Sequence, residues 1–188
     1  MDIYHITLFV HIMTLVVAAA VTAITKLAVA RRARARTVAE VLDWHNVLTS
    51  TAKLFPVCLV VFVVSGAYMM SVTHIAPWST GFIVAGLAGV GLLLVSGIYL
   101  ALKGKALGQV LEAMAKQNPN QPAPRLVPPR LVAALPMINT GIALSVAFDM
   151  VTKPDSVGVA LAIVALGILL GAAGSLRHAA PASEKAEA

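Results

Sequence analysis

The chain has 188 residues, of which 59% are hydrophobic and 12% are charged, and its net charge is +6. A soluble domain averages roughly 45–50% apolar and about 25% charged residues, so this composition excludes an ordinary soluble protein. Apolar runs such as Val57–Val64 do not alternate with polar residues, as the strands of a membrane β-barrel must. We therefore predict an all-α, polytopic membrane helical bundle, because a helix satisfies its own backbone in lipid.

Five apolar segments are long enough to cross a bilayer, which takes about 20 residues each. The first could be a cleaved signal peptide, but no Lys or Arg precedes it and it exceeds the usual length of such a segment. We predict one transmembrane domain over residues 1–178 and a disordered cytoplasmic tail over residues 179–188. The predicted helices cover about residues 4–30, 52–73, 80–102, 131–152 and 156–176.

Basic residues gather at alternate ends of these segments, which predicts the orientation because Lys- and Arg-rich loops stay in the cytoplasm. The N-terminus is then outside and the C-terminus inside, in a bacterial-type cytoplasmic (inner) membrane. The positive charge is explained by topology and lipid headgroups, so the bilayer and not nucleic acid is the expected partner. The basic residues that decide this are Arg31, Arg32, Arg34 and Arg36 after the first segment, and Lys103 and Lys105 after the third.

Two connecting stretches have patterns of their own. Thr37 and Glu40 have the spacing of a capping box, and apolar residues at helical spacing follow them. We expect an interfacial helix there, continuous with the second transmembrane segment. Residues Asn118–Pro129 are rich in proline and are predicted to form an extended cytoplasmic linker.

Polar residues of the first segment recur every three or four positions and therefore share one helical face. His11 belongs to this stripe and is predicted to face other helices, because polar groups in the bilayer point into the bundle. It lies about 12 Å below the outer end at 1.5 Å per residue. The stripe comprises Thr7, His11, Thr14, Ala18, Thr22 and Thr25.

Further polar and sulfur-containing groups fall in the same outer half. Imidazole and thioether groups are axial ligands of haem, and they also suit copper. The candidate ligands are His11, Met69, Met70 and His74. Asp149 is a candidate proton relay, and Lys153 stands four residues later, where a local ion pair is available.

Each candidate also has an ordinary structural interpretation. His11 could be hydrogen-bonded to a neighbouring helix, and Met69 and Met70 could pack against other helices. His5 and His74 could be solvated near the surface. Asp149 and Lys153 could form a purely structural pair, and His45 could be interfacial.

Glycines on the third and fifth segments indicate close helix packing. Gly167 and Gly171 form a small-xxx-small pattern, which serves either packing within the chain or contact with another subunit. The sequence contains no P-loop, zinc-type cysteine pair, nucleophile elbow or dinucleotide-binding fingerprint, which argues against conventional soluble enzyme chemistry.

Three short motifs carry a family resemblance: Leu8-Phe9-Val10-His11, Pro56 with Ser65-Gly66-Ala67-Tyr68-Met69, and Met150-Val151-Thr152-Lys153-Pro154. Through them the chain resembles the CopD-like superfamily of small integral membrane proteins, and most closely an uncharacterised family within it. Copper-resistance protein D and the HemJ-type protoporphyrinogen oxidases belong to the same superfamily. The resemblance implies that His11 binds haem b or handles copper, and that Lys153-Pro154 is a shared feature.

These observations predict a membrane redox or metal-handling protein whose site lies in the outer half of the bundle. Haem b is the first candidate cofactor and copper binding or permeation the second. The alternative class is a cofactor-free accessory subunit or a small-solute transporter. A homo-oligomer or a redox partner subunit is compatible with either class.

Overall fold

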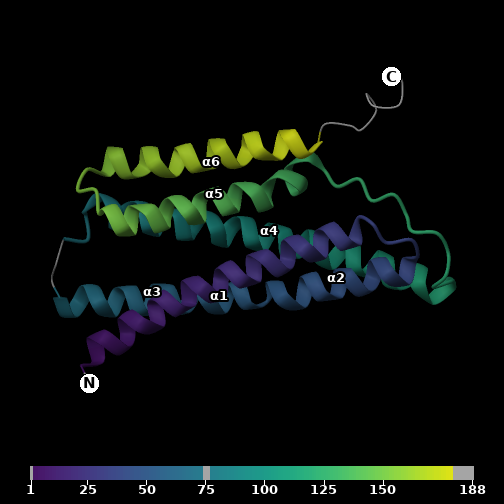
Figure 1. The fold of residues 1–188 in the computed structure, drawn as a ribbon, viewed down its shortest axis with the longest axis horizontal. Coiled ribbons are helices and arrows are strands. Elements are labelled where there is room, and N and C mark those ends of the chain that lie inside the picture. Colours follow the sequence, from purple (N-terminus) through teal and green to yellow (C-terminus); the bar gives the residue numbers. More distant parts are fainter. Residues whose placement is uncertain (1, 74–76, 180–188) are drawn as a thin grey trace. The chain divides into compact units, whose positions relative to one another are not determined.

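A computed structural model describes residues 2–73 and 77–179. Within these ranges all regular structure is helical apart from one isolated bridge, which confirms the predicted all-α bundle. Five helical spans are long and apolar enough to cross a bilayer, and one of them, Val38–Val72, comprises two consecutive helices. The protein is therefore a multi-pass membrane protein. The helices are α1 (Ile3–Arg32), α2 (Val38–Ala52), α3 (Leu54–Thr73), α4 (Gly81–Gln117), α5 (Arg130–Thr152) and α6 (Val157–Ala179) (Figure 1).

The chain divides into two compact units. The first unit comprises residues 1–76 and 97–127, and the second comprises residues 77–96 and 128–188. α4 therefore belongs to both, with its first part in the second unit and its remainder in the first. α4 is also longer than the predicted helix, which ended near residue 102, because helix-favouring residues continue to Gln117 and the next proline follows at position 119.

In the first unit, α1 lies along α2 and α3 (Figure 1). Its polar stripe is the packed face, as its spacing predicts: Thr14 is buried and the other members are half-buried. The threonine hydroxyls of the stripe donate to carbonyls of their own helix, for example Thr14 to Val10 (2.7 Å) and Thr22 to Ala18 (2.8 Å). The hydroxyl hydrogens are therefore already used within α1.

The stretch before the second span forms α2, which begins at the predicted cap. The Glu40 N–H donates to Thr37 Oγ1 (3.3 Å), and the Arg36 N–H donates to a Glu40 carboxylate oxygen (2.7 Å). α2 and α3 follow each other almost without interruption, and residues Val38–Val72 count as one apolar span. The predicted continuity of the interfacial helix with the second span is therefore present.

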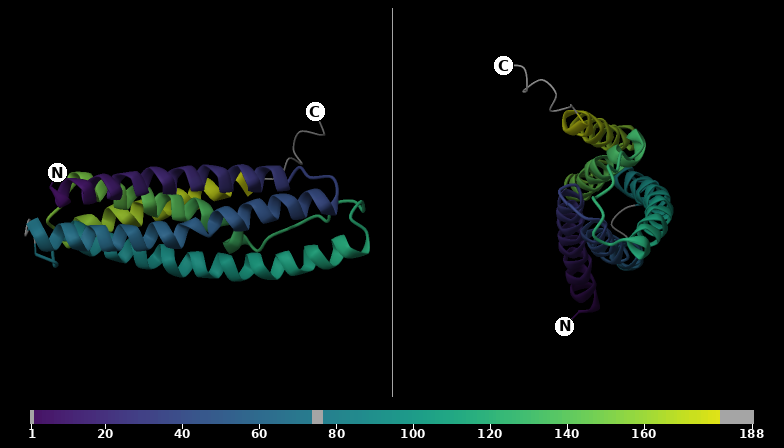
Figure 2. Two further views of the ribbon diagram at one scale, coloured as in Figure 1. Left: turned by 90° about the horizontal axis from the view of Figure 1, so that it is seen from below. Right: turned by 90° about the vertical axis from the view of Figure 1, so that its right-hand side faces the viewer.

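The proline-rich linker after α4 is extended and is attached to the start of α2 (Figure 2). The Val38 N–H donates to the Gln121 carbonyl (3.1 Å), and the Ala123 N–H donates to the Arg36 carbonyl (2.8 Å). These bonds satisfy backbone groups at a helix start, where amides lack intrahelical partners.

In the second unit, α5 and α6 pack with their backbones in contact. A Cβ on Gly141 would collide with the Gly167 carbonyl, and one on Gly171 would lie 2.6 Å from the Met137 carbonyl oxygen. The Gly167-xxx-Gly171 pattern therefore serves packing within the chain. The first part of α4 adds Ala85 to a small core with Ala160 and Val164 of α6.

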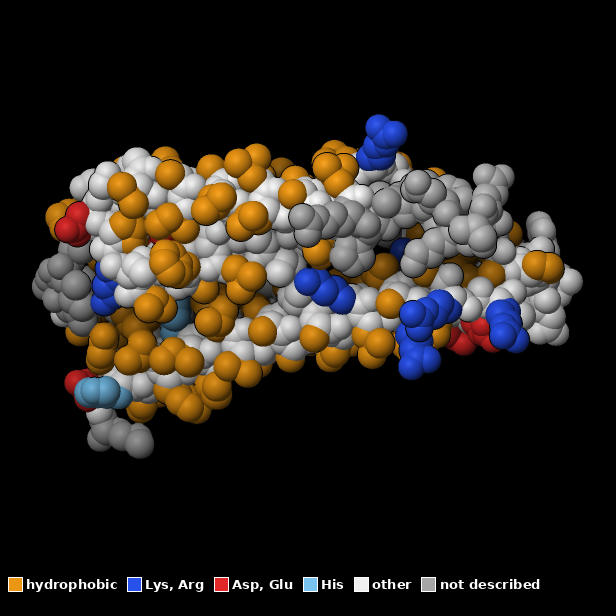
Figure 3. Space-filling view, turned by 45° about the horizontal axis from the view of Figure 1, so that its top comes forward, with side chains coloured by type: hydrophobic (Ala, Val, Ile, Leu, Met, Phe, Trp, Pro, Cys, Tyr) orange, Lys and Arg blue, Asp and Glu red, His pale blue; other side chains and the backbone are white. Residues whose placement is uncertain are grey.

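Large apolar side chains are exposed along the helices, as expected where lipid replaces water. Phe9 is 63% exposed and Leu169 is 65% exposed. Hydrophobic side chains cover much of the described surface that is visible in Figure 3. His74 and most of the predicted disordered tail, from residue 180 onward, lie outside the described residues.

Candidate functional site

His11 forms a hydrogen bond to α3, within the first unit. Its Nδ1 lies 2.8 Å from Ser65 Oγ. The Ser65 hydroxyl also contacts the Val61 carbonyl one turn earlier in α3. Ser65 is 6% exposed and His11 is half-buried where α1 meets α3.

The hydrogen bonds of Ser65 determine which nitrogen of His11 carries the hydrogen. A serine hydroxyl has one hydrogen and two acceptor lone pairs. Its hydrogen goes to the Val61 carbonyl, which can only accept, so Ser65 accepts from His11. Neutral His11 is then protonated at Nδ1, and Nε2 carries a free lone pair. No hydrogen bond to Nε2 is formed by residues in the described ranges.

The imidazole ring is held on two further sides. Phe62 of α3 meets it edge-on, with ring centroids 5.0 Å apart and an interplanar angle of 79°. A Cβ on Gly66 would lie 3.7 Å from His11 Cε1, so the small residue leaves the ring close to the α3 backbone. Ring orientation is therefore set by Ser65, Phe62 and Gly66 together.

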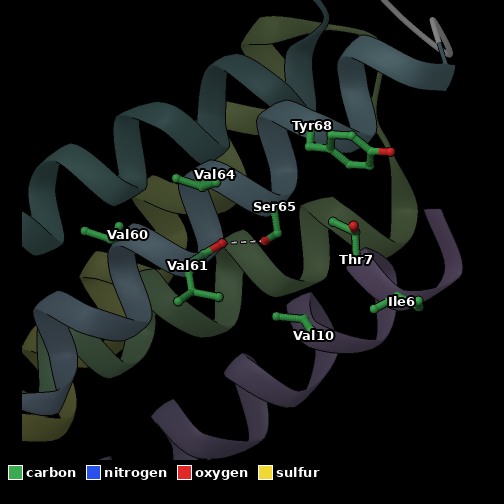
Figure 4. Close-up of a pocket in the computed structure, with 8 residues that line it drawn as sticks. All are labelled: Ile6, Thr7, Val10, Val60, Val61, Val64, Ser65 and Tyr68. Atoms are coloured by element: carbon green, nitrogen blue, oxygen red, sulfur yellow. Dashed lines mark hydrogen bonds between the residues drawn. The ribbon is translucent and has the colours of Figure 1, made fainter. Parts of the chain in front are cut away.

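Next to this pair lies a hollow of about 400 Å³ between α1 and α3 (Figure 4). This volume falls in the range of roughly 300–1,000 Å³ that small-molecule sites occupy. Its wall is mainly aliphatic, and hydroxyls of Thr7, Ser65 and Tyr68 are the polar exceptions. The lining residues are Ile6, Thr7, Val10, Val60, Val61, Val64, Ser65 and Tyr68.

The other candidate ligands stand at different places. Met69 follows Ser65 by one turn on α3, about 6 Å further along the helix axis, and Met70 is rotated away by one residue. Both methionines are half-buried. His5 is exposed on α1, as expected for a solvated residue, and its Nδ1 lies 3.9 Å from Oδ2 of Asp2. Among the described residues no three His, Cys, Asp or Glu side chains gather as a metal site.

His45 is buried among the helices of the first unit. It is 3% exposed, and its Nδ1 lies 3.2 Å from Nη1 of Arg32 on α1. A guanidinium can only donate, so Nδ1 of His45 accepts and its hydrogen is on Nε2. That nitrogen faces α4, where a Cβ on Gly108 would lie 3.0 Å from it.

Asp149 and Lys153 belong to the second unit, and the ion pair that their spacing allows is not formed in the described part of the chain. Asp149 is 0% exposed and neither carboxylate oxygen has a hydrogen-bond partner there. Lys153 is exposed and caps the end of α5 in the left-handed conformation (φ 49°). Its backbone N–H donates to the Asp149 carbonyl (2.8 Å). Because the helix stops there, the Lys153 side chain does not continue the face of Asp149.

Sequence reasoning identified His11 but missed its partner. The usable signal was Ser65-Gly66, a polar and a small residue side by side within an apolar helix. The Arg32–His45 contact had no comparable signal, because both residues fit a basic interfacial region equally well.

Compared with known proteins, the chain matches no family model, no curated protein and no solved structure.

Proposed function

We propose that this multi-pass membrane protein is a redox or metal-handling protein in which His11 is the ligand of the cofactor. Haem b is the first candidate and copper is the second. The observation that carries the proposal is the hydrogen bond from His11 Nδ1 to Ser65 Oγ, at 2.8 Å.

This hydrogen bond prepares His11 for metal binding. Histidines that bind metals generally donate their other ring N–H to an oxygen acceptor, which fixes the tautomer and the ring orientation. Ser65 is such an acceptor, and it leaves the Nε2 lone pair for the metal. The edge contact with Phe62 restricts the ring further.

The number of available ligands favours haem over a bare copper ion. Haem supplies its own equatorial nitrogens and needs one or two axial ligands from the protein. A bare copper ion takes most of its donors from the protein, and the described residues bring no three His, Cys, Asp or Glu side chains together. Met69 or Met70, or His74 outside the described residues, is the proposed second ligand.

The aliphatic wall beside Ser65 supports the same proposal. Cofactor sites are mostly apolar with a few placed polar groups, and the hollow between α1 and α3 has this composition (Figure 4). The chemistry that haem would supply is one-electron transfer. Ser65, Phe62 and Gly66 would orient the His11 imidazole that holds the group.

An absorption spectrum of the purified full-length protein tests the proposal. With haem, a Soret band and reducible α and β bands are expected, and His11→Ala abolishes them. His5→Ala, on the same helix but exposed, is the matched control and leaves the spectrum unchanged. A colourless preparation without metal in elemental analysis contradicts both cofactors and favours the cofactor-free accessory subunit or small-solute transporter.

The wider setting follows from the same proposal. We place the protein in a bacterial-type cytoplasmic (inner) membrane, with the N-terminus outside, and near the CopD-like superfamily that its motifs resemble. Electrons would then come from a redox partner subunit or a second copy of this chain. A copper-loaded but haem-free preparation whose metal is lost in His11→Ala would select the copper alternative.

A further inference from the structure

Asp149 is a fully buried carboxyl group near one end of α5. It shares a face of the helix with two other buried residues, Ile142 and Ser145, at spacings of three and four residues. That face packs in the second unit, where Gly89 of α4 leaves room for Val146 and Gly167 of α6 meets Ser145. Asp149 is 0% exposed.

No group in the described part of this unit offers the carboxylate a hydrogen bond, since both of its oxygens are without a partner. The backbone amides at the start of α4 are used elsewhere. Those of Gly81 and Phe82 donate to the carbonyls of Asp155 (2.9 Å) and Pro154 (3.0 Å). The Lys153 N–H donates to the Asp149 backbone carbonyl.

In the described part of the second unit no charged side chain forms an ion pair with Asp149 either. The segments Gly81–Ser96 of α4 and Val157–Leu176 of α6 contain no Asp, Glu, Lys, Arg or His. On α5 the other charged residue is Arg130, at the opposite end of the helix. The charged residues of the turn after α5, Lys153 and Asp155, are exposed.

An ionised carboxylate cannot persist in this surrounding. Without a counter-charge or a donor its desolvation is so unfavourable that such a group takes up a proton instead. A hard metal cation would need about six or more oxygen ligands, and the described residues form no cluster of acidic groups here. A proton is the one ligand that a single carboxyl can hold unaided.

We propose that Asp149 is a proton-binding site, which holds a proton at neutral pH and releases it only when the helix ends around it admit water. Asp149 stands three residues before the last residue of α5, Thr152, or about 5 Å along the axis. The starts of α4 and α6 meet the same turn, so a small opening there exposes the carboxyl. The site does not depend on His11 and exists with or without a cofactor.

Infrared spectroscopy of the full-length protein in detergent, with aspartate 13C-labelled at the side-chain carboxyl, tests this proposal. The chain has four aspartates, and the other three, Asp2, Asp43 and Asp155, are exposed. At pH 7 one labelled carboxyl in four is expected to give the C=O stretch of a protonated acid. Asp149→Asn removes this band, and Asp155→Asn leaves it. If all four labelled carboxyls are ionised at pH 7, the proposal is overturned. The same holds if the Asp149 carboxylate is ionised and its bands shift on addition of Na⁺ or K⁺, because the site would then bind a cation instead of a proton.

The pH dependence of unfolding is a second measurement, and its sign follows from linkage. The folded state holds a proton that the solvated carboxyl of the unfolded chain has lost, so stability falls as pH rises. The unfolding equilibrium constant rises by up to tenfold per pH unit in the wild type. In Asp149→Asn, which resembles the neutral acid, this dependence is absent. An equal slope in both proteins contradicts the proposal, and neither result depends on the cofactor spectrum.

Discussion

Two histidines of the first unit, His11 and His45, have hydrogen-bonding partners of opposite kind. His11 faces Ser65, whose hydrogen is already donated to the Val61 carbonyl, so His11 must donate from Nδ1. His45 faces the guanidinium of Arg32, which can only donate, so His45 must accept at Nδ1. The same side chain therefore presents a free Nε2 lone pair at one site and an Nε2–H at the other.

Under the proposed function, this difference separates a histidine that binds a ligand from one that serves packing. His45 uses its lone pair on Arg32, and its remaining nitrogen faces the α4 backbone at Gly108. It connects α1, α2 and α4 within the first unit. His11 keeps its Nε2 lone pair, and its partner Ser65 lines an apolar hollow. His11 is half-buried and His45 is buried, but the identity of the partner decides which ring nitrogen keeps its lone pair.

The largest effect is expected for Ser65→Ala. Loss of the acceptor frees the imidazole of His11 to rotate and to change tautomer, which lowers cofactor affinity by about 10–100-fold. Cofactor titration of the purified protein, followed by absorbance, measures this. Ser71→Ala is the matched control, because Ser71 is exposed on α3 and donates to the Tyr68 carbonyl (2.8 Å). Equal affinities of the two variants would contradict the role given to Ser65.

A smaller effect, on stability, is expected for His45→Ala. Hydrogen bonds to charged groups contribute about 1.5–3 kcal/mol, and the substitution leaves the Arg32 guanidinium without its acceptor. His11→Ala removes a bond between neutral groups, which contributes about 0.5–1.5 kcal/mol. Unfolding of the cofactor-free proteins in detergent compares them. If His11→Ala is the more destabilised of the two, the division of roles between the histidines is wrong.

The smallest effect is expected from two glycines on α4. Alanine favours a helix interior over glycine by about 1 kcal/mol. At Gly104 the new Cβ would lie 3.9 Å from Thr49 Cγ2, an ordinary contact, so Gly104→Ala raises stability. At Gly108 the Cβ would lie 3.0 Å from His45 Nε2, and the crowding offsets that gain. The difference in unfolding midpoint between the two variants measures how closely α4 packs against His45. If both variants gain the same stability, α4 does not restrict His45.

Periodicity along one helix was predictable, and contacts between helices were not. The stripe of α1 from Thr7 to Thr25 follows from spacing alone, because a helix repeats every 3.6 residues. That Ser65 would meet His11 depends on the rotation and depth of α3 against α1. The sequence offered Met69 and Met70 as candidate ligands beside His11, whereas the observed hydrogen bond is to Ser65, one turn before Met69 on α3.

Asp149 shows that sequence spacing was also insufficient to predict an ion pair. The four-residue spacing to Lys153 predicts an ion pair only if the helix continues through Lys153. The left-handed conformation there ends α5 instead, and Pro154 follows. The described residues offer the carboxyl no hydrogen bond, and the segments Gly81–Ser96 and Val157–Leu176 of the same unit carry no charge.

The sequence by itself determined the all-α membrane class, the five spans, the packed face of α1, the cap of α2 and the extended linker. Each of these follows from residues close together in the chain, through hydrophobicity, helical period or local hydrogen bonding. Only the tertiary structure decided which partner each buried polar group meets. Those pairings join residues that are far apart in the chain, such as His11 and Ser65, and depend on how helices are rotated and shifted against one another.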